Sequence, residues 1–308
     1  MVLFVCNDEN LNSGESLIED LFVPVITPFD NSGNVDRDAL AAHCAWTVAQ
    51  GARGIMLFGT TGEGPSVSVD EKIATARALT LDLPTVELIG SVTENSATDA
   101  VRCARAYSGL GLAAVLVLPP FYFRESNGDG DGLARFFEVV ARATRIPLMA
   151  YHIPGLAPAV PVHVIADLDL WGAKDSGGDL AYTRAVLDTG KSVMVGAEST
   201  VVDAMRGGAS GTIAGMGNLM PGELARICMA VRAGDDAEAN RLLAIVLRVQ
   251  AAVLGCAPGM EWIAAFKQIA TYLHGAELGG VREPLMSRGD YLTEEVLDAL
   301  ALRDAAAA

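Results

Sequence analysis

Short apolar runs alternate with longer segments of mixed polarity along most of this chain. Val, Ile and Leu dominate the runs, and the segments between them have the length and spacing of helices. Strands that alternate with helices indicate βαβ units and a parallel sheet. The apolar runs cover residues 21–27, 54–59, 86–92, 113–119, 147–153, 170–175, 192–197 and 210–215, and the helical segments between them include 36–50, 69–81, 95–108, 132–144 and 179–189.

The number of these runs favours a closed barrel over an open sheet. Eight strands within about 195 residues are typical of a (β/α)8 or TIM barrel. We therefore predict an α/β fold with one TIM barrel over residues 21–233. Residues 1–20 are polar and irregular and are expected to form an N-terminal extension. Residues 234–308 are rich in Ala and Leu at helical spacing, which predicts a C-terminal helical layer and an assembly surface.

Several helix starts can be predicted from side chains that cap a helix. Ser68 and Glu71 have the spacing of a capping box, in which each side chain binds the backbone N–H of the other residue. Asn95 and Asp179 are also of the type that caps a helix, and each precedes a predicted helix. We expect both of them to act as N-caps.

Composition and charge exclude several classes of partner. The net charge is −16, so the chain lacks the basic surface that nucleic acid or anionic lipid requires. The apolar opening, residues 1–6, is too short for a membrane span and has no basic residue before it. Five scattered cysteines without a C-x-x-C pair predict reduced thiols and a cytoplasmic location. Four widely spaced histidines do not predict a metal site.

The predicted strand 170–175 ends in a lysine that can act as a nucleophile. In a TIM barrel the chemistry takes place at the carboxyl ends of the strands. Alternation puts Leu170, Gly172 and Lys174 on one face, and Trp171 on the other. If Lys174 faces the barrel axis, its apolar surroundings disfavour the ammonium form, and a neutral amine can add to a ketone. The alternative is a lysine at the end of a strand that points into water.

The neighbouring strand, residues 147–153, carries a tyrosine at the same end of the barrel. Adjacent parallel strands lie about 5 Å apart, so Tyr151 is expected close to Lys174. A phenol there can relay protons. The common alternative is a tyrosine whose ring is packed and whose hydroxyl contacts solvent. The same alternation sends His152 toward the helices, where we expect a structural role.

Two loops at this end of the barrel offer polar groups. Thr60 and Thr61 stand in the glycine-rich segment 58–64, whose hydroxyls and backbone N–H groups can hold a carboxylate, and Glu63 is expected to brace it. This segment lacks the spacing of a P-loop or a dinucleotide fingerprint. The loop after the fourth strand carries Tyr122 and Arg124, for which packing or exposure is the alternative.

The ordered set of these segments resembles the dihydrodipicolinate synthase/N-acetylneuraminate lyase family. The similarity covers residues 20–300 and is specific because all the motifs occur in the right order. They are VPVITPFD at the first strand, GTTGEG after the second, PPFYF after the fourth, YHIPG at the fifth, AKDSGGD at the sixth and GASGTIAGMGN at the eighth.

The resemblance implies the roles of the residues that would carry the reaction. Lys174 matches the lysine that forms a Schiff base with pyruvate or another 2-oxo acid. Tyr151 matches the tyrosine that handles protons, and Thr60 the threonine that links this tyrosine to bulk solvent. Thr61 matches the threonine that holds the substrate carboxylate. Tyr122 matches a tyrosine that reaches in from a neighbouring subunit.

The resemblance also implies the remaining features of the site and of the assembly. Gly196 and Ile213 match positions that line the site with backbone carbonyls. The imine is itself the electron sink, so no metal or organic cofactor is implied. The family generally forms homotetramers built as dimers of dimers.

One departure from the family pattern bears on the substrate. Leu156 stands where dihydrodipicolinate synthases usually carry an arginine for the carboxylate of the aldehyde, and an apolar side chain cannot bind it. The segment AKDSGGD resembles that of 4-hydroxy-2-oxoglutarate aldolases, whereas PPFYF and YHIPGLAP resemble sugar-acid lyases. Glu198 and Ser199 stand where those lyases bind hydroxyl groups.

These observations predict a class I aldolase that cleaves or forms a 2-oxo-3-deoxy sugar acid or a hydroxy-oxo diacid with pyruvate as the imine-bound partner. One alternative is 4-hydroxy-tetrahydrodipicolinate synthase despite Leu156. A second is a 2-oxo acid dehydratase, in which water leaves the same imine. A third is a binding protein without activity, against which Lys174, Tyr151 and both threonines argue.

Overall fold

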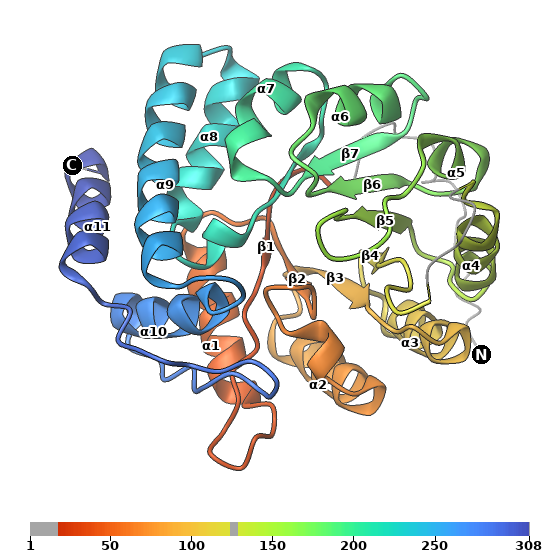
Figure 1. Ribbon diagram of the computed structural model, residues 1–308, viewed down its shortest axis with the longest axis horizontal. Helices are drawn as coiled ribbons and strands as arrows, with labels where there is room; N and C mark the ends of the chain where they lie inside the picture. Colours follow the sequence, from red (N-terminus) through yellow and green to blue (C-terminus); the bar gives the residue numbers. More distant parts are fainter. Residues whose placement is uncertain (1–17, 124–128, 308) are drawn as a thin grey trace, which may run out of the picture.

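Eight parallel strands close into a barrel in which each strand pairs with the next along the chain. The computed structural model describes residues 18–123 and 129–307. The predicted TIM barrel is confirmed (Figure 1). The strands are β1 (Asp20–Pro24), β2 (Gly54–Leu57), β3 (Glu87–Val92), β4 (Ala114–Val117), β5 (Leu148–His152), β6 (Gly172–Asp175), β7 (Ser192–Val195) and β8 (Gly211–Ile213).

Helices follow the strands and surround the barrel. They are α1 (Arg37–Ala49), α2 (Val69–Asp82), α3 (Ala97–Leu110), α4 (Asp131–Ala141), α5 (Val162–Asp167), α6 (Leu180–Leu187), α7 (Val201–Arg206) and α8 (Pro221–Ala233). Short 3-10 turns η1 (Gly64–Ser66), η2 (Glu198–Thr200) and η3 (Gly215–Asn218) follow β2, β7 and β8. The predicted C-terminal helices are present as α9 (Asp236–Cys256), α10 (Trp262–His274) and α11 (Glu294–Ala307). Figure 1 shows these three grouped on one side of the barrel, beside α1 and α8.

Alternation along the strands produces two apolar cores. Met149 and Tyr151 point into the barrel interior, where they pack with Met56 and Met194. Ala150, between them on β5, faces the outer core between strands and helices. The carboxyl end of β5 therefore presents Tyr151 inward, as the period of two predicts.

The alternation predicted for residues 170–175 fails at its beginning. Leu170 packs in the outer core, whereas Trp171 packs against the interior cluster. The reason is that β6 begins only at Gly172, and a period of two holds only where the backbone is extended. Lys174 lies within the strand, so its inward orientation is unaffected.

Two of the three predicted helix caps are correct. Ser68 and Glu71 form the capping box of α2, and the Asp179 carboxylate accepts a hydrogen bond from the Ala181 N–H at the start of α6. Asn95 was expected to cap α3, but Ser96 does so. The Asn95 side chain instead accepts hydrogen bonds from the backbone of the loop after β4, which a local pattern does not reveal.

Helix α9 is the one helix, among the residues described, that is long and apolar enough by composition to cross a membrane. Its buried residues recur every three to four positions, as in Leu242, Val246 and Val249. This stripe is typical of a helix that packs against a globular core. Helices α8 and α11 cover α9, so its apolar character is accounted for by packing.

Candidate active site

A cavity of about 210 Å³ lies at the carboxyl ends of the strands. This is the end of a TIM barrel at which active sites are found. The cavity brings together seven of the nine predicted site residues, which are Lys174, Tyr151, Thr60, Thr61, Gly196, Ile213 and Glu198. The lining does not include Tyr122 or Ser199.

Lys174 and Tyr151 face each other across neighbouring strands. They are paired in the register between β5 and β6, and the Lys174 Nζ lies 3.3 Å from the Tyr151 hydroxyl. Nζ also lies 4.4 Å from the centre of the Tyr151 ring and 3.9 Å from the Met56 sulfur. The lysine side chain is 3% exposed. The amine is therefore enclosed by the barrel interior and not by solvent.

Thr60 extends this pair toward the outside of the barrel. Its hydroxyl lies 3.3 Å from the Tyr151 hydroxyl, and Thr60 is more exposed than Tyr151. A hydroxyl chain thus runs from Thr60 through Tyr151 to the Lys174 amine. Thr61 is buried beside it, with its hydroxyl close to Gly215.

The loop that carries both threonines has an uncommon backbone. Phe58 and Glu63 have positive φ angles of 59° and 53°, which are costly for residues with a side chain and are found at sites where function requires them. A Cβ on Gly64 would lie 1.9 Å from the Phe58 carbonyl oxygen. Only glycine can therefore occupy position 64 in this tight turn.

Glu63 braces this loop against the C-terminal helices. The Lys267 Nζ, on α10, lies 2.6 Å from the Glu63 Oε1, and both side chains are fully buried. The other carboxylate oxygen accepts a hydrogen bond from the Arg282 N–H, at 2.9 Å. Burial lowers the pKa of Lys267, and the Glu63 carboxylate opposes this shift. The bracing role of Glu63 was predicted, whereas its partner Lys267 was not, because nothing in the local sequence connects α10 to the loop.

Gly196 provides space for the lysine. A Cβ at this position would lie 2.0 Å from the Ser176 hydroxyl and 3.0 Å from the Lys174 Cε. A larger residue would therefore press on the Lys174 side chain. Gly196 and Ile213, at the ends of β7 and β8, complete the lining around Lys174.

Glu198 and Ser199 follow β7 but have different environments. Glu198 is buried, and its carboxylate accepts hydrogen bonds from the Met216 N–H at 2.9 Å and the Gln250 side-chain amide at 2.8 Å. Ser199 is exposed and lies outside the described lining of the cavity. The 3-10 turn η2 changes the direction of successive side chains, so adjacency in sequence does not place both of them at the cavity.

Tyr122 is on the surface of this chain. It is 75% exposed and forms an edge-to-face contact with Phe123, at 5.0 Å between ring centres. Asn95 fixes the backbone at this point by accepting a hydrogen bond from the Tyr122 N–H, at 2.9 Å. Arg124 lies outside the described residues.

The C-terminal helices supply a wall of the cavity that sequence analysis missed. It consists of Gln250 and Leu254 of α9, Trp262 and Phe266 of α10, and Met260 between the two helices. Trp262 and Phe266 are one turn apart and contact each other edge to face, at 5.1 Å. In a single sequence, these residues have the apolar helical pattern of ordinary packing, so no signal identified them.

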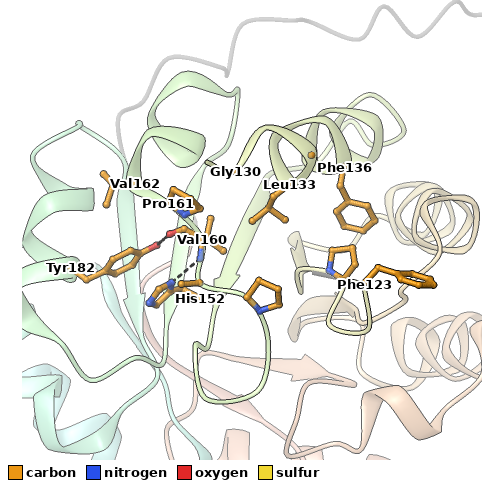
Figure 2. A pocket seen from close by; sticks show the side chains of 13 residues that line it. Phe123, Gly130, Leu133, Phe136, His152, Val160, Pro161, Val162 and Tyr182 are labelled. Carbon is orange, nitrogen blue, oxygen red and sulfur yellow. Dashed lines mark hydrogen bonds between the residues drawn. The ribbon is translucent and has the colours of Figure 1, made fainter. Parts of the chain in front are cut away.

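A larger cavity, of about 850 Å³, lies on the other side of β5. Figure 2 shows His152 and Tyr182 on one wall, and Leu133 and Phe136 on the opposite wall. His152 stacks on Tyr182 at 3.7 Å and accepts a hydrogen bond from the Val160 N–H. Burial lowers the pKa of His152, which favours its neutral form. His152 thus faces the helices, and this cavity does not contain the Lys174 amine.

A buried amine beside a phenol at the end of a TIM-barrel strand is the arrangement expected of a class I aldolase. The model of the dihydrodipicolinate synthetase family matches residues 17–300, and this chain belongs to that family. It is therefore a lyase of the aldolase type.

Individual relatives agree with this assignment. The 4-hydroxy-tetrahydrodipicolinate synthase of Agrobacterium fabrum is 30% identical over 89% of this chain and 94% of its own length. Two solved structures share the fold at 22% identity. They are the sialic acid aldolase of Ruminococcus gnavus, with a TM-score of 0.86 over 94% of this chain and 98% of that one, and the prophage protein YagE of E. coli in complex with pyruvate, with a TM-score of 0.83 over 94% and 99%.

Proposed function

We propose that this protein is a pyruvate-dependent class I aldolase in which Lys174 forms a Schiff base with the 2-oxo acid. The observation that carries the proposal is the buried Lys174 amine, 3.3 Å from the Tyr151 hydroxyl, at the carboxyl end of the barrel. The solved structure of YagE with pyruvate supports the choice of 2-oxo acid.

The reaction follows from the positions of these groups. The Lys174 amine adds through its free electron pair to the ketone carbon of pyruvate, and uptake of a proton with loss of water gives a protonated imine. The methyl carbon then loses a proton to give an enamine, and its electron pair forms a bond to the carbon of an aldehyde. The aldehyde oxygen takes up a proton. Water then hydrolyses the imine, which frees Lys174 and a 4-hydroxy-2-oxo acid. Cleavage is the same sequence in reverse.

Proton transfer is assigned to the hydroxyl chain beside the amine. Tyr151 lies within 3.3 Å of both Lys174 and Thr60, so it can exchange protons with the reacting atoms and pass them to Thr60. Thr61 is proposed to hold the pyruvate carboxylate through its hydroxyl. Backbone carbonyls at Gly196 and Ile213 are proposed to complete the site.

The surface position of Tyr122 supports an oligomeric enzyme. An exposed pair of aromatic rings, Tyr122 and Phe123, is typical of a protein interface. We propose a cytoplasmic homotetramer in which Tyr122 contributes to the site of a neighbouring subunit.

Synthesis of 4-hydroxy-tetrahydrodipicolinate is the less favoured alternative, although several relatives carry that name. The aldehyde in that reaction bears a carboxylate. Leu156 lies at the cavity where the family resemblance predicts an arginine, and Lys174 is the sole basic side chain among the described residues of the lining.

Reduction with borohydride tests the Schiff base. Incubation with pyruvate followed by borohydride is expected to add the pyruvate-derived group to Lys174, as located by peptide mass spectrometry. Lys174→Arg keeps a long basic side chain but has no primary amine to form the adduct, so trapping and turnover should be lost. Lys191→Arg, which alters a lysine that binds two backbone carbonyls outside the cavity, is the matched control. An adduct on Lys72 or Lys267, or none at all, would overturn the proposal.

A further inference from the structure

The charges around the cavity restrict the second substrate. Lys174, Tyr151 and Glu198 are the titratable side chains among the described lining residues. The Lys174 nitrogen becomes part of the protonated imine. The positive charge of the imine then stabilises the electron pair that forms on the reacting carbon. The one carboxylate among these three side chains belongs to Glu198. A second carboxylate, brought by the aldehyde, would enter a site whose described lining residues offer a like charge and no further basic side chain, and burial of an unpaired charge is unfavourable.

Glu198 and Gln250, two polar residues of the lining, already bind each other. The Gln250 amide donates a hydrogen bond to one oxygen of Glu198, and the Met216 N–H donates one to the other oxygen. A substrate hydroxyl would compete with these two contacts or share them. Glu198 therefore has a structural role, because its two hydrogen bonds join η3 to α9.

Ser176 adds a hydroxyl to the lining beside Gly196, and most of the other side chains toward the C-terminal helices are apolar. Leu156 and Leu254 lie at its rim and are 44% and 48% exposed, although both are hydrophobic. Met260, Trp262 and Phe266 continue this surface inward. Exposed apolar side chains next to an aromatic pair are typical of a surface that a ligand covers.

We propose that the aldehyde partner is uncharged and carries an alkyl or aryl group that lies against Leu156, Leu254 and Trp262. The inference rests on the proposed aldolase function and narrows its substrate class. It replaces the sugar acid and the diacid that the motifs suggest with a 4-hydroxy-2-oxo acid whose fourth carbon bears an apolar group. The enamine carbon of pyruvate bonds to the aldehyde carbon, and the aldehyde oxygen becomes the hydroxyl.

A panel of aldehydes tests this proposal with the full-length protein. Condensation with pyruvate is measured as kcat/KM for benzaldehyde and 3-methylbutanal, for glyceraldehyde, and for glyoxylate and aspartate semialdehyde. The apolar aldehydes are expected to react at least about 10-fold faster than the hydroxylated and charged ones. This ratio corresponds to about 1.4 kcal/mol of transition-state free energy.

Two variants that add a positive charge test whether Leu156 sets the preference among aldehydes. Leu156→Arg is expected to raise kcat/KM for glyoxylate and aspartate semialdehyde about 10-fold and to lower it for benzaldehyde, because the new guanidinium can bind a carboxylate. Leu81→Arg adds the same charge at a position on α2 that is 76% exposed and outside the cavity lining, so it should leave the ranking of aldehydes unchanged.

The outcomes separate this inference from the proposed function. If borohydride traps pyruvate on Lys174 but glyceraldehyde or a charged aldehyde reacts as fast as the apolar ones, the inference is wrong and the aldolase assignment stands. If no imine forms with pyruvate, the proposed function itself fails. If a folded Leu156→Arg protein ranks the aldehydes by kcat/KM as the wild type does, the proposed contact of the aldehyde with Leu156 is also wrong.

Discussion

Glu63 and Lys267 form a buried ion pair that joins the threonine loop to the C-terminal helices, with 2.6 Å between Oε1 and Nζ. The two residues belong to opposite halves of the sequence. Loss of Lys267 would leave the Glu63 carboxylate buried without its cation, which is far more costly than loss of a surface pair.

Lys267→Met is therefore expected to lower the free energy of unfolding by about 3–5 kcal/mol. The double variant Glu63→Gln, Lys267→Met should recover part of this loss, because no unpaired charge stays buried. Urea denaturation measures both. Arg142→Met removes an exposed pair with Glu138 and should cost less than about 1 kcal/mol. A similar cost for Lys267→Met and Arg142→Met would contradict the role of the buried pair.

The loss of folding stability in acid should come partly from His43. Burial lowers its pKa from 6.5 to about 4, so the unfolded chain binds a proton at a higher pH than the folded chain. The free energy of unfolding should therefore fall as the pH decreases from about 6.5 to 4, by up to about 3 kcal/mol.

The measurement is urea denaturation at a series of pH values. His43→Gln is expected to flatten the profile in this window, even if the protein is less stable throughout. Exposed His163 is the comparison, and His163→Gln should keep the wild-type slope. An unchanged slope in His43→Gln would rule out His43 as its source. His274, 3.0 Å from His43, has its pKa lowered by burial as well and contributes with the same sign.

Tyr151→Phe should reduce kcat by about 100- to 10,000-fold, because its hydroxyl joins the amine to Thr60. Trapping of pyruvate on Lys174 should still occur, but more slowly. Tyr182→Phe removes a hydroxyl that donates to the Val160 carbonyl, outside the cavity that contains Lys174, so kcat should change little. Turnover by Tyr151→Phe at the wild-type rate would exclude the tyrosine from proton transfer.

Tyr122 can be tested by mixing two inactive proteins. Lys174→Arg and Tyr122→Phe subunits, unfolded and reassembled together, are expected to regain part of the activity, because some sites would combine an intact lysine with an intact tyrosine from another chain. Native mass spectrometry would verify the mixed oligomers. No recovery in verified mixtures would indicate that each site is built from one chain.

Much of the site could be predicted because its signals are local. Strand periodicity places Lys174 and Tyr151 inside the barrel, and a parallel register brings them side by side. The capping box at Ser68 is equally local. The alternation failed only at Leu170 and Trp171, ahead of the strand, because sequence does not mark where an extended backbone begins.

The tertiary structure alone decided which distant groups meet. His43 and His274 are 231 positions apart in the chain and yet in contact, and Gln250 reaches Glu198 across 52 positions. Helix periodicity specifies which face of α9 or α10 is buried, but not which element that face will contact. The sequence therefore determined the barrel and the inward position of Lys174, whereas the packing of the C-terminal helices decided the wall of the cavity opposite the strands.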